Sequence, residues 1–408
     1  MRILIVSQHF WPEEFRVNDL AAGLVERGHN VTVLTGKPNY PGGDIFEAYR
    51  QDPSAFSEYA GARIVRAPLI ARGKGGALRL MLNYLSFAVT GSTIGVWRLR
   101  HLKFDAAFVF QTSPITAAIP ALVMKRVKRT PVLLWVQDLW PDTLAAIGVF
   151  RSRPLLGLVG LLVSGIYRGC DRILVQSRDF EERVRHYAGP TKPVDYFPNW
   201  FEPMFSGRAA PAAELKGFAS TFNIMFAGNL GEAQDLPTIV EAAGLCRDLT
   251  NLRWLVVGDG RARSTMQRAV EQMNLSDRIV FLGRHSSVRM PDFFQSADAM
   301  LVSLKAQPIW SMTIPSKVQS YMAAGRPVLG MIDGEGARVI TESGSGWSSP
   351  AGDAKGLADN VRRLLELSSE EREAMGDAGQ VYAHTHFDRT ILIAELEMWF
   401  EEARSAVR

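Results

Sequence analysis

FAGNLGEAQDLPTIVEAA, residues 226–243, combines an apolar strand, a glycine turn and a helix that begins at Asp235 with Pro237 in its first turn. Gly228 and Gly231 allow the backbone to approach a ligand closely. The helix start offers unpaired N–H groups and a partial positive charge, which together suit an anion. This pattern predicts a parallel α/β sheet, and the turn holds either an anion or no ligand at all.

Short apolar, β-branched segments alternate with helical patterns on both sides of this stretch. We predict strands in residues 2–8, 30–36, 62–68, 104–111, 131–137, 172–177 and 194–199, and again in 222–228, 252–260, 278–284, 298–304 and 326–332. A segment rich in Pro, Gly, Ala and Ser separates the two sets. We therefore expect two Rossmann-like α/β domains, residues 1–200 and 221–387, joined by a linker at 201–220.

Composition and charge narrow the class of protein. Of 408 residues 47% are hydrophobic and 22% charged, which is typical of a globular chain. Two cysteines far apart argue against disulfides and metal sites and favour a reducing compartment. The short apolar run in MRILIVSQ reads as a first strand rather than a secretion signal.

The basic residues gather in the first half of the chain. Residues 1–198 hold 25 Lys and Arg against 16 Asp and Glu, a net charge of +9, whereas the remainder carries −5. Aromatic residues are not interleaved with these cations, so we expect no nucleic-acid partner. An anionic membrane surface or a merely solvated basic face remain as alternatives.

Two apolar segments, residues 80–97 and 154–167, are candidates for membrane contact. The first contains the polar residues Asn83, Ser86, Thr90 and Ser92, and the second is too short to cross a bilayer, so we expect buried or interfacial helices. Leu78, Leu82, Leu85 and Val89 share one helical face. That face either packs in a core, which we favour, or contacts a membrane.

Three features in the second half suit a diphosphate. A helix capped by Thr313 would place Lys317 in its first turn, where the helix dipole opposes a lysine unless an anion compensates. Residues 334–338 again place glycines and Arg338 at a helix start. Together with the 228–235 turn, these helix starts indicate a diphosphate that carries a sugar.

Other motifs argue against dinucleotide and metal binding and supply candidate carboxylates. LVVGDGRAR, residues 255–263, has Arg263 where a dinucleotide fingerprint needs its third glycine, and no DxD metal clamp occurs in the chain. In the first half, carboxylates follow strands in HFWPEEFRVNDL and WVQDLWPD. Asp138 could orient or deprotonate a sugar hydroxyl, and Asp142 could do the same or cap a helix.

These segments resemble the retaining GT-B glycosyltransferases of family 4. The resemblance rests on the order of HFWPE, LVERGHNVTVLT, VQDLWPD, AGNLG, GDGRAR, FLGR, PSKVQSYMAAGRPVL and ESGSGWSSPAGD, and it covers nearly the whole chain. PNYPGG and DLWPD resemble a branch that transfers N-acetyl-L-fucosamine or a related hexosamine in bacterial O-antigen and capsule assembly. The resemblance implies two parallel sheets facing across a cleft, a final helix at about 388–408 that returns to the first domain, and no metal or other cofactor.

The helix starts, the strand ends and the resemblance together give the expected site residues. We expect Asp138 and Lys317 to be catalytic. Nucleotide-sugar binding falls to Gly228, Asn229, Leu230, Gln234, Gly258, Arg284, Ser316, Lys317, Ser320, Gly334, Glu335, Gly336 and Arg338. Acceptor binding falls to His9, Glu13, Arg16, Gln137 and Asp142.

The chain departs from the family at four positions. Asn229 and Gln234 stand where the family has an Arg and a Lys, and Met312 and Ser320 stand where it has two glutamates. We therefore expect Lys317 and backbone amides to hold most of the diphosphate.

The sequence thus predicts a cytoplasmic enzyme on the inner face of the cell membrane. It would move a sugar from a UDP-sugar to a polyprenyl-diphosphate-linked saccharide. A UDP-sugar epimerase and a non-catalytic sugar-nucleotide-binding subunit are the alternatives.

Overall fold

The computed structural model describes residues 1–73, 75–146, 152–207 and 209–407, and the chain forms two compact units. The N-terminal unit comprises Met1–Pro198 with Leu392–Arg408, and the C-terminal unit comprises Asn199–Ile391. The units divide two residues before the expected boundary at 200. Arg208 of the expected linker and Arg408 of the expected last helix lie outside the described residues.

The described part of the N-terminal unit contains one sheet, with strand order β3-β4-β2-β1-β5-β6-β7-β8. Its strands are β1 (Arg2–Val6), β2 (Asn30–Thr35), β3 (Glu58–Tyr59), β4 (Ala62–Arg66), β5 (Ala106–Gln111), β6 (Val132–Val136), β7 (Arg172–Val175) and β8 (Val194–Tyr196). Only β3 runs antiparallel to its neighbour in this described sheet. The carboxyl ends of β1, β5 and β6 are therefore adjacent, and they collect the residues after these strands.

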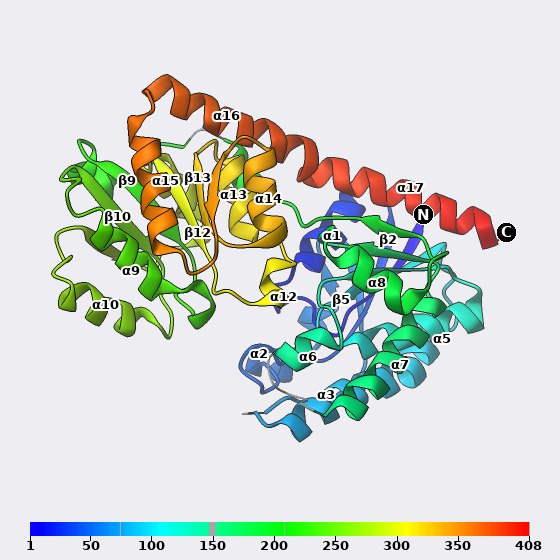
Figure 1. Cartoon of the computed structure of the whole chain (residues 1–408). Helices are drawn as coiled ribbons and strands as arrows, with labels where there is room; N and C mark the ends of the chain where they lie inside the picture. The colour runs from blue at the N-terminus through cyan, green and yellow to red at the C-terminus, as the bar shows by residue number, and fades with distance from the viewer. Residues whose placement is uncertain (74, 147–151, 208, 408) are drawn as a thin grey trace. The chain divides into compact units, whose positions relative to one another are not determined.

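Helices cover this sheet (Figure 1). They are α1 (Arg16–Glu26), α2 (Glu47–Gln51), α3 (Ala77–Thr90), α4 (Val96–Arg98), α5 (Ile119–Lys128), α6 (Asp142–Ala146), α7 (Arg153–Gly169), α8 (Phe180–Ala188) and α17 (Arg389–Val407), with short turns η1 (Ser54–Phe56), η2 (Gly91–Gly95) and η3 (Ile115–Ala118). Helix α5 contacts both α3 and α7, so these three helices form one layer. Among the described residues, no helix is both long and apolar enough to span a bilayer.

The apolar face of α3 points the other way from our expectation. Asn83, Phe87 and Ala88 are buried. The four residues expected in the core are instead exposed: Leu78, Leu82, Leu85 and Val89. The core interpretation of this face was therefore wrong, because periodicity shows which residues share a face but not which face is buried.

The last helix, α17, completes the N-terminal unit as the family resemblance implied. Phe400 packs edge-on against Phe108 of β5, and Trp399 packs against Phe197. Glu397 accepts hydrogen bonds from Arg27 at 2.8 Å and contacts His29 at 2.6 Å. Ile391, near the start of this helix, is half exposed, whereas Leu396 is fully buried.

The described part of the C-terminal unit contains a parallel sheet with strand order β11-β10-β9-β12-β13-β14. Its strands are β9 (Phe222–Ala227), β10 (Leu252–Val257), β11 (Ile279–Gly283), β12 (Ala299–Ser303), β13 (Val328–Met331) and β14 (Gly346–Ser349). Its helices are α9 (Leu236–Leu245), α10 (Arg263–Gln272), α11 (Met290–Gln295), α12 (Pro308–Ser311), α13 (Ser316–Ala323), α14 (Gly334–Glu342), α15 (Ala354–Glu366) and α16 (Ser369–His386). The core of this unit lies between the sheet and helices α9, α10 and α15.

The segment expected as a linker, residues 201–220, packs against the C-terminal unit. It contains the short turns η4 (Pro203–Ser206) and η5 (Ala213–Phe218). Phe205 is buried and stacks on Phe294 at 5.1 Å between ring centroids, and Leu215 is also buried. These apolar contacts make the segment part of this unit rather than a free connection.

Replacing the fully buried Leu396 by alanine should lower the free energy of unfolding of the N-terminal unit by about 2–5 kcal/mol, because it removes core contacts and leaves a cavity. Met398 of the same helix is exposed, so Met398→Ala is the matched control and should change stability by less than about 0.5 kcal/mol. Urea unfolding measures both variants. Equal losses would show that α17 is not docked through Leu396.

Candidate functional site

The glycine turn after β9 is built by close backbone contact with the turn after β10. Gly228 N donates to Val257 O at 2.9 Å, and Leu230 N donates to Asp259 O at 2.9 Å. A Cβ added to Gly258 would lie only 1.9 Å from Gly228 O. Both Gly228 and Gly258 have positive φ, so glycine is required at each position.

Lys317, in the first turn of α13, reaches this turn. Its Nζ donates a hydrogen bond to Gln234 Oε1 at 2.8 Å and lies 3.6 Å from the centroid of the Phe226 ring. A Cβ on Gly228 would lie 2.8 Å from Lys317 Cε. One turn along α13, the hydroxyl of Tyr321 donates to Ala227 O at 2.9 Å, which fixes the helix against the end of β9.

Burial disfavours the charged form of Lys317 in the unliganded protein. Removal from water lowers the pKa of Lys317 to about 7. Among the described residues Lys317 makes no ion pair with a carboxylate, and its hydrogen-bond partner is a neutral amide. A buried cation with only neutral partners is stabilised by any anion that reaches it.

The other residues expected in the 228–235 turn differ in exposure. Leu230 is buried in the core, whereas Asn229 is exposed beside Gly260. A short turn, η6 (Glu232–Gln234), precedes α9, and Asp235 begins the helix with φ of 47° while its carboxylate accepts a hydrogen bond from Thr238. The sequence pattern did not indicate η6.

The first turn of α14 carries its own carboxylate. Glu335 is fully buried and pairs with the exposed Arg338. Its second oxygen, Oε1, has no hydrogen-bond partner among the described residues. Gly334 approaches Ser311 O so closely that an added Cβ would lie 1.9 Å away, and Gly336 packs near Pro315. Because Glu335 and Arg338 neutralise each other, this helix start attracts an anion less than we expected. It does present Glu335 Oε1 as a buried hydrogen-bond acceptor.

Thr313 does not cap α13: its hydroxyl donates to Trp310 O, and Pro315 occupies the cap position. The cap prediction was wrong because α13 begins only at Ser316, so Pro315 rather than Thr313 precedes its first turn. Arg284 is exposed just after the edge strand β11, and no described contact joins it to Lys317.

A carboxylate that the sequence pattern missed lies beside Ser320. Ser320 Oγ contacts Glu202 Oε2 at 3.3 Å and Ser316 O at 3.1 Å. Gln319 Nε2 donates to Asn199 O at 2.5 Å and so ties the same segment to α13. Ser320 lies three residues after Lys317 on α13, so the Glu202 carboxylate contacts the same helix that carries the ammonium. No sequence signal could reveal this pairing, because 118 residues separate Ser320 from Glu202.

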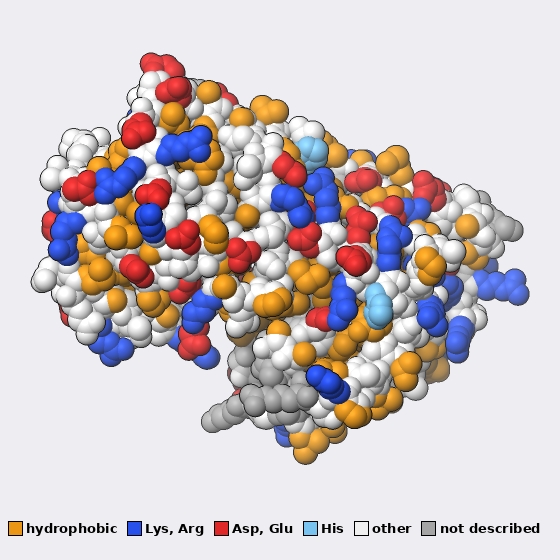
Figure 2. All heavy atoms as spheres, viewed as in Figure 1, with side chains coloured by type: hydrophobic (Ala, Val, Ile, Leu, Met, Phe, Trp, Pro, Cys, Tyr) orange, Lys and Arg blue, Asp and Glu red, His pale blue; other side chains and the backbone are white. Residues whose placement is uncertain are grey.

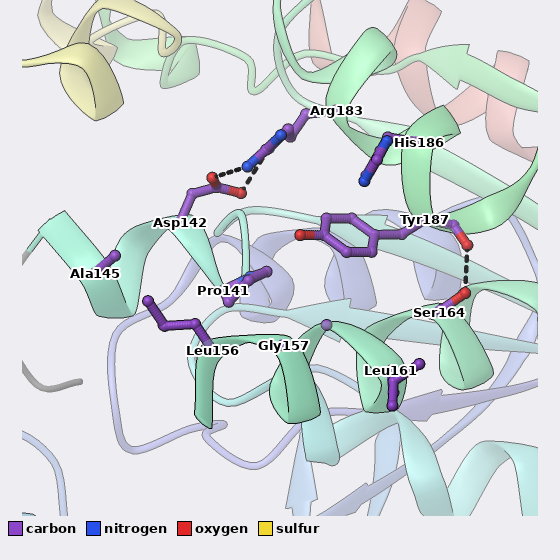
Figure 3. Close-up of a pocket in the computed structure, with 11 residues that line it drawn as sticks. Pro141, Asp142, Ala145, Leu156, Gly157, Leu161, Ser164, Arg183, His186 and Tyr187 are labelled. Atoms are coloured by element: carbon purple, nitrogen blue, oxygen red, sulfur yellow. Dashed lines mark hydrogen bonds and ion pairs between the residues drawn. The ribbon is translucent and has the colours of Figure 1, made fainter. Parts of the chain in front are cut away.

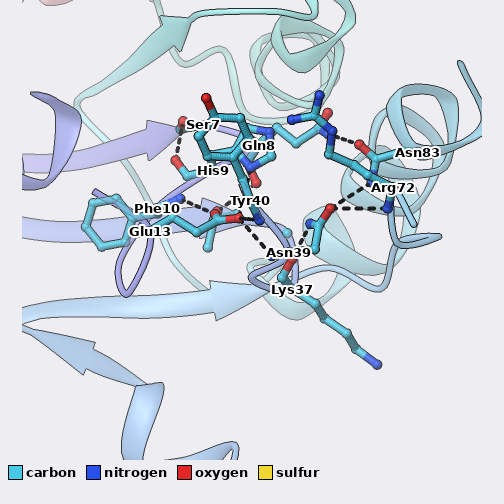
Figure 4. Close-up of polar contacts among 12 residues, drawn as sticks. Ser7, Gln8, His9, Phe10, Glu13, Lys37, Asn39, Tyr40, Arg72 and Asn83 are labelled. Atoms are coloured by element: carbon cyan, nitrogen blue, oxygen red, sulfur yellow. Dashed lines mark hydrogen bonds and ion pairs between the residues drawn. The ribbon is translucent and has the colours of Figure 1, made fainter. Parts of the chain in front are cut away.

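In the N-terminal unit, Glu13 organises the loops after β1 and β2 (Figure 4). Its Oε1 accepts hydrogen bonds from Asn39 N at 2.8 Å and Tyr40 N at 2.7 Å, and it contacts His9 Nδ1 at 3.1 Å. Its Oε2 accepts from Phe10 N at 3.1 Å. The sequence analysis expected Glu13 and His9 to bind the acceptor. In the structure both side chains are buried and hold this loop in place.

Asn39, which the sequence analysis did not single out, extends this network. Its side-chain oxygen accepts from Arg72 N at 3.3 Å and from Asn83 Nδ2 at 3.4 Å, and Asn83 also accepts from Gln8 Nε2 at 2.7 Å (Figure 4). Arg16 begins α1 and is half-buried. The motif PNYPGG, residues 38–43, therefore has a local role in holding the carboxyl end of β1.

Asp138 lies at the carboxyl end of β6. Its Oδ2 accepts a hydrogen bond from Ser113 Oγ at 2.9 Å, and the same hydroxyl accepts from Trp140 Nε1 at 3.0 Å. Burial raises the pKa of Asp138, and the Ser113 hydrogen bond opposes that shift only in part. Gln137, just before it, accepts at its backbone oxygen from Gln176. A buried carboxyl of raised pKa at a strand end can orient a hydroxyl or exchange a proton with it.

Asp142 begins α6 and lies at a cavity of about 510 Å³ (Figure 3). Its carboxylate pairs with both Nε, at 2.9 Å, and Nη2 of Arg183. His186 and Tyr187 of α8 and Leu156 and Leu161 of α7 also line the cavity. Because Arg183 already neutralises Asp142, this carboxylate is a structural partner of α8 and leaves a cavity with mixed polar and apolar walls.

The sequence matches two domain families and several curated relatives. Residues 14–200 match the glycosyl transferase 4-like domain, and residues 221–367 match the glycosyl transferases group 1 domain. A probable glycosyltransferase of Pseudomonas aeruginosa, WbjE, is 27% identical over 58% of this chain and 60% of its own length. A putative colanic acid biosynthesis glycosyl transferase of Escherichia coli K12, WcaI, is 25% identical over 80% of this chain and 82% of its own.

Among solved structures, Anabaena Alr3699/HepE in complex with UDP has a TM-score of 0.71 at 13% identity, covering 98% of this chain and 100% of its own. This likeness is one of fold. The two domain matches and the curated relatives show that the chain is a glycosyltransferase with a glycosyl transferase 4-like domain and a glycosyl transferases group 1 domain, and its two Rossmann-like units have the GT-B fold.

Proposed function

We propose that the protein transfers N-acetyl-L-fucosamine or a related hexosamine from a UDP-sugar to a polyprenyl-diphosphate-linked saccharide during bacterial surface polysaccharide synthesis, with retention of the anomeric configuration. The observation that carries the proposal is the buried Lys317 ammonium beside the Gly228 turn, with only neutral partners. A diphosphate is the anion that this arrangement suits, because the start of α9 lies at the same strand end as the Lys317 ammonium.

The proposed nucleotide and the proposed pathway are supported by what related proteins bind and by their names. HepE, which has the same fold, binds UDP, and WcaI is named for colanic acid biosynthesis. These names support a UDP-linked donor and a role in a bacterial polysaccharide. The choice of sugar rests on the PNYPGG and DLWPD segments alone.

The reaction needs stabilisation of the leaving diphosphate. The bond from the sugar C1 to the β-phosphate oxygen breaks while the acceptor oxygen bonds to the same face of C1, and the acceptor proton passes to the departing phosphate oxygen. Lys317 and the turn amides would neutralise the charge that grows on the diphosphate, without a metal ion. Asp138 would orient the acceptor hydroxyl.

Glu335 and Glu202 would recognise the rest of the donor. Glu335 Oε1 is a buried acceptor with no partner among the described residues, so it would accept a sugar hydroxyl. Glu202, held beside Ser320, would accept the ribose hydroxyls and take the place of the family glutamate missing at position 320.

Lys317→Met should lower turnover about 100-fold or more in an assay with UDP-N-acetylhexosamines and polyprenyl-diphosphate-linked saccharides, because it removes the charge that stabilises the leaving group. Lys305→Met, at an exposed lysine of the same unit, is the control and should keep the wild-type rate. EDTA should not change the wild-type rate.

The same assay can contradict the proposal. Wild-type turnover by Lys317→Met would refute the role of the ammonium, and a product of inverted anomeric configuration would refute retention. Epimerisation of the UDP-sugar without an acceptor would favour an epimerase.

Glu202→Gln should weaken UDP binding about 10- to 100-fold, since a hydrogen bond to a charged acceptor is lost, yet leave the affinity for 2′,3′-dideoxy-UDP unchanged. Glu366→Gln, at an exposed position of the same unit, should alter neither affinity. Titration calorimetry provides both constants. Equal losses for UDP and its dideoxy analogue would show that Glu202 acts only through the structure of the 199–203 segment.

A further inference from the structure

The helix layer of the N-terminal unit presents an apolar face to the solvent. On α3, Leu78, Leu82, Leu85 and Val89 are 40% to 66% exposed, and they follow one another at spacings of three or four residues. This spacing places all four on one side of the helix. Asn83, Phe87 and Ala88, on the other side, are buried, so the helix is anchored to its unit while its apolar face is uncovered.

The neighbouring helices extend this face. On α7, Leu155, Leu158, Leu161 and Leu162 are 38% to 72% exposed, and on α5 Val127 is also exposed. Because α5 contacts both α3 and α7, the apolar residues belong to one layer. Figure 2 shows hydrophobic side chains at the edge of the unit where Figure 1 draws α3 and α7. Contiguous exposed apolar surface of this kind marks an interaction site.

The charges on these three helices indicate what kind of partner the apolar face contacts. The three helices α3, α5 and α7 together carry six Lys or Arg and no Asp or Glu. Arg79 of α3, Arg126 of α5 and Arg153 of α7 are exposed. An apolar face bordered by cations and nearly free of carboxylates complements an anionic lipid surface, where each Lys or Arg contributes about 1 kcal/mol.

An exposed tryptophan lies on the short helix that follows α3. Trp97 of α4, which follows α3 through η2, is 60% exposed, and the Arg100 guanidinium lies 4.0 Å from the centroid of its ring. A tryptophan with a neighbouring arginine is typical of the level of lipid headgroups.

We propose that the α3–α5–α7 layer docks on an anionic membrane, with the leucines of α3 and α7 in the headgroup–acyl boundary and the flanking arginines at the phosphates. The docking face is distinct from the Lys317 site. Membrane binding can therefore fail while UDP binding and sugar transfer persist, and the reverse also holds.

The test is co-sedimentation of the full chain with vesicles of phosphatidylcholine alone and of phosphatidylcholine with phosphatidylglycerol. The protein should bind the anionic vesicles, and its affinity should fall as salt rises. The variant Leu78→Ser, Leu82→Ser, Leu85→Ser, Leu158→Ser should bind them at least about tenfold more weakly, because it removes the apolar anchor. UDP affinity should stay at the wild-type value, and urea unfolding with a wild-type midpoint for the N-terminal unit shows that the variant is folded.

The matched control replaces exposed apolar residues of the C-terminal unit, Leu245→Ser, Val288→Ser and Val381→Ser, and should bind vesicles as the wild type does. Brominated lipid should quench a fluorescence component that Trp97→Phe removes. The proposal is overturned if the wild type fails to bind anionic vesicles at low salt, or if the leucine variant binds as the control does. It is also overturned if the wild type is a dimer in solution that the leucine variant makes monomeric, since the face is then a protein interface.

Discussion

The burial of a single ammonium group against a glycine turn is the constraint on which the C-terminal unit depends. Lys317 Nζ lies over the Phe226 ring and donates to a neutral amide, and the chain around it leaves no room for larger residues at Gly228 and Gly258. Tyr321 fixes α13 to the end of β9 and so keeps the lysine in place. Lys317 is thus placed to bind an anion, because its hydrogen-bond partner in the protein is a neutral amide.

This constraint explains the departures from the family pattern. Gln234, where the family resemblance implies a lysine, accepts the hydrogen bond of Lys317. Ser320, where the resemblance implies a glutamate, contacts Glu202 from the segment that precedes the sheet.

The sequence predicted the fold well and the details of the site less well. Alternating apolar segments located twelve strands, but β3 with two residues and β14 with its small, polar residues carry too little pattern. The juxtaposition of Lys317 with the 228–235 turn could be expected because both follow strands at one sheet edge. Glu202 beside Ser320, the use of Glu13 as a loop anchor and the outward face of α3 depend on tertiary packing, which local pattern does not encode.

The most direct test of the account is the proton balance of UDP binding. With a free-protein pKa of about 7, Lys317 is largely neutral at pH 8.5, and a bound diphosphate would raise its pKa. Calorimetry in buffers of different ionisation enthalpy should therefore show close to one proton taken up per UDP bound at this pH, where the UDP phosphates are already ionised. Affinity should weaken as pH rises from 7 to about 9, and Lys317→Arg, which stays charged, should show neither effect. No proton uptake by the wild type, or the same uptake by Lys317→Arg, would contradict the claim that the buried ammonium holds the diphosphate.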